Sequence, residues 1–180
     1  MGRINKRDDL LEAVVAIIER DGLTPVTLDA VAIETGMTRA GLLYHFPSRE
    51  ALVRATHEHL TAQWESDLIA QAGKTANEAT EAERHAAYIN VCVTAARRVE
   101  LLLMLENSEA GGLGELWQEI IDRWAPPAPE PDDAVGVDRF IARIAADGLW
   151  MHEALSAKPL SPALRRRIVA RLADLLGGQS

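Results

Sequence analysis

The stretch of sequence that decides the fold is Leu28–Phe46, which reads LDAVAIETGMTRAGLLYHF. Its apolar residues are spaced for two short helices, over 28–35 and 39–45. Ala32 lies four residues before Gly36, as is typical of a helix-turn-helix motif. In that motif only a small side chain fits where the two helices cross, and glycine tolerates the positive φ of the turn. A tight helical hairpin without any role in DNA binding has the same pattern, so the motif alone leaves two interpretations open.

The remainder of the chain is also predicted to be helical, because its apolar residues recur at helical spacing and no alternating strand pattern is present. Residues 125–133 hold four prolines and cannot form a helix, and Gly111–Gly114 is predicted to be a loop or hinge. The sequence therefore predicts an all-α fold of about nine helices. The seven helices outside the motif are expected at 6–21, 49–72, 78–97, 99–107, 113–124, 134–156 and 162–176.

Length and composition limit the classes of protein that the chain can belong to. It has 180 residues, of which 48% are hydrophobic and 26% charged, as in an ordinary globular protein of one or two domains. The longest aliphatic run, Leu101–Leu105, is too short to span a membrane, and the N-terminus lacks the apolar core of a signal peptide. The single cysteine, Cys92, cannot form an internal disulfide, so a cytoplasmic location is expected.

The charge distribution argues against a non-specific nucleic-acid binder. The chain has 19 basic and 27 acidic residues, a net charge of −8. Positive charge is concentrated only at the extreme N-terminus, where Arg3, Lys6 and Arg7 occur without an acidic neighbour before Asp8. Any contact with DNA must therefore come from a few well-placed side chains.

A family resemblance extends the interpretation of the motif. Residues 27–37 (TLDAVAIETGM) and 38–55 (TRAGLLYHFPSREALVRA), together with the apolar helix before them, resemble the N-terminal DNA-binding domain of the TetR family of transcriptional regulators. The resemblance covers residues 1–60, and the more C-terminal part matches only in its helical architecture. Leu43 stands where the family usually has an aromatic residue, and Arg49 stands where lysine is usual.

This resemblance implies a domain of residues 1–48 that binds DNA. The helix 49–72 then joins it to a helical effector-binding and dimerisation domain, residues 49–180. The implied function is that of a sequence-specific regulator, a homodimeric repressor released from a palindromic double-stranded DNA operator by a small hydrophobic ligand. A helical interaction or ligand-binding module without DNA binding is the alternative, and an enzyme is the least favoured class.

Arg39, near the start of the second motif helix, is the best candidate for reading a base, because its guanidinium matches O6 and N7 of guanine. A phosphate contact from a solvated arginine is the alternative. Thr27 is expected to cap the first motif helix and also to contact a phosphate. Tyr44, His45 and Arg49 are expected to contact phosphates. Arg3 and Lys6 are expected to reach the backbone or minor groove as a flexible arm, with a disordered arm that makes no contact as the alternative. The full set of candidates for DNA contact is Thr27, Thr38, Arg39, Ala40, Gly41, Tyr44, His45, Arg49, Arg3 and Lys6.

A single short recognition helix contacts only a few bases, so two copies on a palindrome are expected. The last two predicted helices carry apolar stripes suited to pairing with a second copy. The candidate dimer residues are Phe140, Ile144, Gly148, Leu164, Ile168, Leu172 and Leu175. A hairpin buried within one chain is the alternative.

The candidates for an effector pocket are apolar residues of the second domain with a few polar residues between them. The apolar candidates are Trp64, Tyr88, Cys92, Met104, Trp117, Phe140, Trp150 and Met151, and the polar ones are His85, Asn107 and His152. Each of them also fits a place in an ordinary core.

No cofactor or metal site is expected. His57 and His59 are spaced i, i+2, so they point to different faces of a helix and cannot share a metal ion there. A nucleophile elbow, a phosphate-binding loop and an HExxH motif are absent from the sequence.

Overall fold

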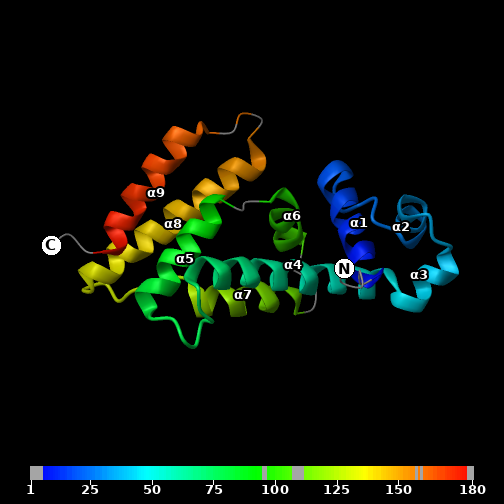
Figure 1. The fold of residues 1–180 in the computed structure, drawn as a ribbon, viewed down its shortest axis with the longest axis horizontal. Coiled ribbons are helices and arrows are strands. Elements are labelled where there is room, and N and C mark those ends of the chain that lie inside the picture. Colours follow the sequence, from blue (N-terminus) through cyan, green and yellow to red (C-terminus); the bar gives the residue numbers. More distant parts are fainter. Residues whose placement is uncertain (1–5, 95–96, 107–111, 157, 159, 178–180) are drawn as a thin grey trace. The chain divides into compact units, whose positions relative to one another are not determined.

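The computed structural model describes residues 6–94, 97–106, 112–156, 158 and 160–177. Within these residues the chain forms nine α-helices and no strand (Figure 1), which confirms the predicted all-α fold. None of the described helices is both long enough and apolar enough to cross a membrane. The helices are α1 (Lys6–Asp21), α2 (Leu28–Thr35), α3 (Arg39–His45), α4 (Arg49–Ala72), α5 (Glu81–Thr94), α6 (Arg98–Glu106), α7 (Leu113–Trp124), α8 (Ala134–Leu155) and α9 (Pro162–Leu176).

Side chains that satisfy free backbone N–H groups set several of the helix starts. The Ser48 hydroxyl accepts from the backbone N–H of Ala51 at 3.1 Å, and the Ser161 hydroxyl accepts from Leu164 at 3.2 Å. Pro162 then occupies the first turn of α9, where its missing N–H leaves no bond unmade. These local bonds explain why helix boundaries could be predicted closely from the sequence.

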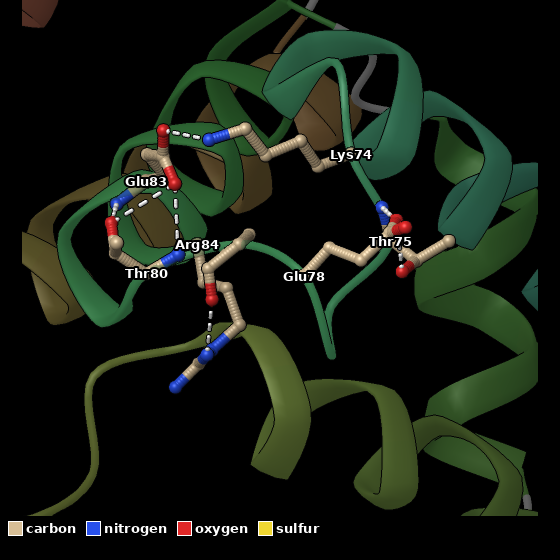
Figure 2. Close-up of polar contacts among 7 residues, drawn as sticks. Lys74, Thr75, Glu78, Thr80, Glu83 and Arg84 are labelled. Carbon is tan, nitrogen blue, oxygen red and sulfur yellow. Dashed lines mark hydrogen bonds and ion pairs between the residues drawn. The ribbon is translucent and has the colours of Figure 1, made fainter.

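The start of α5 differs from the prediction of a helix over 78–97. Thr80 and Glu83 form a reciprocal capping box: the Glu83 carboxylate accepts from the Thr80 N–H at 2.8 Å, and the Thr80 hydroxyl accepts from the Glu83 N–H at 3.3 Å (Figure 2). Lys74 donates to the same carboxylate at 2.6 Å, and these bonds lower the pKa of Glu83 to about 2. Thr75 and Glu78 make a similar pair just before it. The capping box therefore starts α5 at Glu81.

α7 spans Leu113–Trp124, as predicted for residues 113–124, so Leu113 and Gly114 of the predicted loop Gly111–Gly114 belong to the helix. Residues 95–96 and 107–111, which include Asn107, lie outside the described residues, as does Arg3.

The described chain divides by packing into two compact units. Unit 1 holds the described residues up to Gln63 and those of Arg98–Leu116, and unit 2 holds the described residues of Trp64–Arg97 and of the chain from Trp117 onward. The predicted domain boundary at residue 48 coincides with the start of α4, whereas the division by packing falls inside that helix.

The core of unit 1 is built around the apolar face of α1. Leu10, Leu11, Val14, Ile17 and Ile18 of this helix are all buried. Buried side chains of α3 and α4 complete the unit, and α6 packs on α1. Burial on this scale is what holds such short helices in place, because helices of seven or eight residues are not stable alone.

The core of unit 2 is formed where α5, α8 and α9 pack against one another. Their small buried residues, such as Ala87, Ala142 and Ala146, allow close approach of the helices. α8 and α9 lie side by side as a helical hairpin (Figure 1).

Candidate nucleic-acid interface

The turn between α2 and α3 has the geometry that the sequence predicted. Gly36 adopts a left-handed conformation with φ of +65°, and the N–H of Met37 donates to the carbonyl of Ala32 at 3.0 Å. The Thr38 hydroxyl caps α3 by accepting from the N–H of Gly41 at 3.1 Å. Ala32 is buried, as expected for the residue at the helix contact. α2 and α3 therefore form a helix-turn-helix in the strict structural sense.

The two faces of α3 differ sharply in their exposure. Leu42 is fully buried, and Phe46 beyond the helix end belongs to the same core. Arg39 and Ala40 are exposed on the opposite side, and Tyr44 is 87% exposed with its hydroxyl free to reach a phosphate. An apolar inner face therefore fixes a short helix whose outer face is available to the major groove.

Other predicted contact residues lie at the edges of this surface. His45 is half-buried, and its ring meets that of Tyr44 edge-on with centroids 5.3 Å apart. Lys6 is exposed in the first turn of α1. A Cβ atom at Gly41 would lie 3.1 Å from the Met37 side chain, so even alanine would require Met37 to move slightly.

Arg39 has a partner that the sequence analysis did not anticipate. Its Nε lies 3.5 Å from Oδ1 of Asp29, which is in the first turn of α2, and both side chains are largely exposed. The candidate base reader is thus held loosely by a carboxylate of the neighbouring helix in the absence of DNA. A helical-wheel reading of α3 alone could not find this pair, because it depends on the packing of α2 against α3.

Thr27 occupies the predicted N-cap position of α2. Its side-chain oxygen accepts from the backbone N–H of Ala30 at 3.1 Å, and the residue itself is exposed. The other free N–H groups of this helix start could donate to a phosphate, for which the positive end of the helix dipole is favourable.

Arg49 is bound more tightly than a free phosphate anchor would be. Its Nε donates to the backbone carbonyl of Val26 at 2.8 Å, so the side chain joins the start of α4 to the segment that leads into Thr27. Arg49 therefore positions the α2 N-terminus. Its role as a phosphate contact remains a prediction.

The predicted dimer residues differ in how far their own chain covers them. Ile144 is 55% exposed, Leu164 is also exposed, and a Cβ atom at Gly148 would meet no atom within 4 Å. Phe140, Ile168 and Leu175 are partly covered. Leu172, by contrast, is only 5% exposed because it packs inside unit 2, so it belongs to the protomer core rather than to an open face.

The exposed face of α8 includes residues that the sequence analysis did not assign to the dimer. Ile141 and Met151 are exposed there, and together with Ile144, Gly148 and exposed Leu155 they recur at alternating spacings of three and four, which is one side of a helix. Met151, predicted as an effector contact, thus lies on this open face. Only the solvent exposure of Met151 separates a surface position from an interior ligand contact, and solvent exposure cannot be read from the sequence.

The predicted effector residues are distributed over both units. Trp64, Tyr88 and Trp117 come together in unit 2, with ring centroids 5.9 Å apart for Trp64 and Tyr88 and 5.8 Å for Trp64 and Trp117. Met104 falls in unit 1, and His152 is exposed.

A carboxylate that the sequence analysis missed lies beside this aromatic group. The Tyr88 hydroxyl donates to Asp147 at 2.8 Å, and the Cys92 thiol lies 4.0 Å from the same oxygen. An acidic residue inside the apolar stretch of α8 was the available signal.

One small cavity of unit 2 has a volume of about 70 Å³. Among the predicted effector residues only His85 lines it, and burial lowers the pKa of this histidine. The complete lining is Glu81, His85, Pro126, Pro127, Pro129, Asp133, Gly136 and Arg139.

The fold and the exposed recognition helix define a helix-turn-helix transcriptional regulator. Residues 10–56 match the family described as bacterial regulatory proteins, tetR family, and residues 82–177, more than half of the chain, match the tetracyclin repressor-like C-terminal domain. The chain therefore belongs to the tetR family of bacterial regulatory proteins, as its sequence indicated.

Individual relatives are similar over different extents. The HTH-type transcriptional regulator BetI of Brucella anthropi is 33% identical over 92 residues, which is 51% of this chain and 46% of that protein. The match thus spans about half the length of this curated relative. A transcriptional regulator from Saccharomonospora viridis, solved in complex with choline, has a TM-score of 0.69 at 19% identity, with 96% of each chain covered.

A second solved structure, a transcriptional regulator from Pseudomonas aeruginosa PAO1, has a TM-score of 0.68 at 16% identity, with 96% of this chain and 91% of that chain covered. At such low identities these two likenesses establish a shared fold.

Proposed function

We propose that this chain acts in the cytoplasm as a homodimeric repressor that binds a palindromic operator and is released from it by a small molecule bound in unit 2. The observation that carries the proposal is the outward face of α3, where Arg39, Ala40 and Tyr44 are exposed on a helix fixed by buried Leu42. Side chains at the start of such a helix are the ones that reach base edges in the major groove.

The net charge of residues 1–48 favours binding to a specific DNA sequence over binding to DNA of any sequence. Residues 1–48 contain five basic and seven acidic side chains, so this part of the chain is weakly acidic. Affinity for arbitrary DNA depends on the number of phosphates neutralised, and few basic groups are available here. A single half-site should therefore bind weakly, and two copies on one palindrome would supply the missing affinity.

The open face of α8 supports a second copy as the dimer partner. Ile141, Ile144, Met151 and Leu155 expose apolar surface along one side of the helix, with Gly148 between them. A contiguous apolar face of this kind is unfavourable in water and typical of an interface. A partner helix could approach closely at Gly148, where no side chain intervenes.

Two observations support the binding of a small molecule in unit 2: the polar and aromatic side chains inside this unit, and the fold that it shares with a solved regulator. The Saccharomonospora viridis regulator of the same fold was solved with choline, so a small ligand is compatible with this architecture. α4 begins at Arg49, next to the helix-turn-helix, and continues to Trp64 and beyond. This helix could transmit a change on ligand binding, provided that the ligand prefers the conformer that fits DNA less well.

The test of DNA binding begins with selection of duplexes from a random-sequence library by the purified protein. We expect a palindromic consensus, bound at least about tenfold more tightly than a scrambled duplex. Failure to enrich any sequence, with folded protein confirmed by circular dichroism, would contradict the proposal.

The test of dimerisation compares three substitutions to aspartate. Ile144→Asp places a charge on the open face and should give folded monomers by sedimentation. Leu172→Asp places the charge in the protomer core and should unfold unit 2, at a cost of several kcal/mol. Val135→Asp, at an exposed apolar position in the first turn of α8, should remain dimeric. A folded, monomeric wild type would refute the dimer.

A further inference from the structure

Three side chains of unit 1 bring polar atoms together between α1 and α4. Glu12 belongs to α1, whereas His59 and Gln63 belong to α4, where a separation of four residues places them on one face of the helix. Oε1 of Glu12 lies 2.7 Å from Nε2 of His59 and 2.7 Å from Nε2 of Gln63. The two nitrogens are themselves only 2.9 Å apart. The proposed DNA and dimer surfaces make no use of this cluster.

Hydrogen bonds alone cannot satisfy all three of these contacts while Glu12 is ionised. Its carboxylate only accepts, so Nε2 of His59 must carry a proton to bond it, and this N–H then faces the amide N–H of Gln63 at 2.9 Å. If the neutral ring carries its proton on Nδ1 instead, the bare Nε2 faces the carboxylate oxygen at 2.7 Å. Rotating the Gln63 amide by 180° sets two oxygens against each other at 2.7 Å. One of the three contacts is therefore repulsive in every arrangement.

A metal ion among these atoms would make their close approach favourable. Imidazole nitrogen, carboxylate oxygen and amide oxygen are all metal ligands, and the Gln63 amide offers its oxygen once it is rotated. Metal–ligand bonds of about 2.0–2.1 Å at right angles place neighbouring ligand atoms about 2.8–3.0 Å apart. The observed separations of 2.7, 2.7 and 2.9 Å are close to those of one triangular face of an octahedron.

The cluster is accessible from solvent and carries a suitable charge. The side chain of Glu12 is 48% exposed and that of His59 is 14% exposed, and the carboxylate gives the cluster one negative charge when the ring is neutral. No group of three or more His, Cys, Asp or Glu side chains in the described part of the chain could hold a metal ion, so this cluster depends on an amide as its third ligand. Sequence analysis could not find it, because Glu12 and His59 lie 47 positions apart.

We propose that unit 1 binds a divalent first-row transition-metal ion through Nε2 of His59, a carboxylate oxygen of Glu12 and the amide oxygen of Gln63. The imidazole ligand favours nickel, cobalt or zinc over magnesium and calcium, which take oxygen ligands. Water molecules complete the coordination on the exposed side. The ion joins α1 to α4 at Gln63, where α4 leaves unit 1, so it stabilises this unit against unfolding.

The choice of metal can be tested on the full-length protein without a purification tag. Ni²⁺ and Mg²⁺ are titrated separately by calorimetry, and thermal unfolding is followed with and without each ion. We expect one Ni²⁺ per chain, bound at least about tenfold more tightly than Mg²⁺, and a higher melting temperature with Ni²⁺. Absence of Ni²⁺ binding, or equal binding of the two ions, would overturn the proposal.

Matched variants test the assigned ligands. His59→Ala and Glu12→Gln should each weaken Ni²⁺ binding at least about tenfold. Two controls should leave it unchanged: His152→Ala removes an exposed histidine of α8, and Glu58→Gln removes an exposed carboxylate that is next to His59 in sequence but about 100° away around α4. Circular dichroism identifies any variant that is misfolded. Wild-type Ni²⁺ affinity in either folded ligand variant, or an equal loss in the controls, would refute the assignment.

Gln63→Glu distinguishes a metal site from a hydrogen-bonded cluster by the sign of its effect. The new carboxylate is a better metal ligand than the amide, but without metal it repels Glu12. The metal-free variant should therefore unfold at a lower temperature than the wild type, whereas its Ni²⁺ binding should become at least about tenfold tighter. Unchanged or weaker Ni²⁺ binding by the folded variant would exclude Gln63 as a ligand and overturn the site. All these measurements are made without DNA, so a failure to select an operator would leave them unaffected.

Discussion

The ion pair between Arg39 and Asp29 gives the sharpest test of how this protein reads DNA. Nε of Arg39 lies 3.5 Å from Oδ1 of Asp29, and the two side chains are 63% and 65% exposed. To contact a guanine, the guanidinium must leave the carboxylate. The perturbations are therefore Arg39→Ala, Asp29→Asn and the two combined.

The exposure of the pair sets the magnitude of each effect. An ion pair this exposed contributes about 0.2–1 kcal/mol, whereas a bidentate contact of arginine with guanine contributes about 1–3 kcal/mol. The free energy needed to release Arg39 from Asp29 is therefore smaller than the free energy gained from the contact with guanine. Arg39→Ala should lose about 1–2 kcal/mol per half-site on the selected duplex, which is roughly 5- to 30-fold. Asp29→Asn should strengthen binding to every sequence, by up to about fivefold per half-site.

Fluorescence anisotropy with the selected and the scrambled duplex, at several salt concentrations, measures both effects. The double-mutant cycle isolates the pair: the gain from Asp29→Asn should be smaller when Arg39 is already alanine. If Arg39→Ala binds the two duplexes in the wild-type ratio, Arg39 is not a base reader. If the gain from Asp29→Asn is the same in both backgrounds, the ion pair does not restrain Arg39, and the carboxylate acts only by repelling phosphate.

Three further predictions follow from the contacts of single residues. Arg49→Lys keeps the charge but loses the guanidinium bond to the Val26 carbonyl, so it should weaken DNA binding at an unchanged salt slope. Arg49→Gln removes the charge, and a slope lowered by about one in this variant would identify a phosphate contact, whereas an unchanged slope would exclude one. Gly136→Ala should destabilise unit 2 in thermal unfolding, because its Cβ would lie 2.8 Å from that of Pro129; an unchanged melting temperature would contradict this. Burial lowers the pKa of His57 to about 4, so the free energy of unfolding should fall as the pH decreases from about 6.5 toward 4, and less steeply in His57→Gln; equal pH profiles of the two proteins would be the contrary result.

The helices could be predicted almost residue by residue because their boundaries are encoded locally. Thr27, Thr38 and Ser48 each cap the helix that follows, and a glycine with positive φ follows α2. Gly22, Gly73 and Gly177 directly follow α1, α4 and α9, at positions visible in the sequence. The burial of Leu42 and the exposure of Arg39 also followed from helical periodicity.

The start of α5 was predicted wrongly although its capping box, Thr80 and Glu83, is local. The other errors concern interactions between segments that are distant in the sequence. α9 is apolar on more than one side, and periodicity cannot say which of these sides faces its own chain. Leu172 was therefore predicted at the dimer interface, although it is buried within the protomer. Arg49 and Val26 lie 23 positions apart, and Tyr88 and Asp147 lie 59 apart. Such contacts depend on how the helices pack together, and one sequence without its relatives carries no direct signal for them.

The geometry of α8 links the two proposals for unit 2. Arg143, Asp147 and Trp150 follow one line along this helix, on the side that includes the contact with Tyr88 of α5. Ile144 and Gly148 are each one residue further along, which is about 100° around the helix axis, on the open side. A ligand of unit 2 that shifts or rotates α8 would therefore move the face proposed to hold the second copy. In the proposed dimer the spacing of the two recognition helices would depend on that pairing, so ligand and operator would compete through this one helix, and each would weaken the other by the same factor.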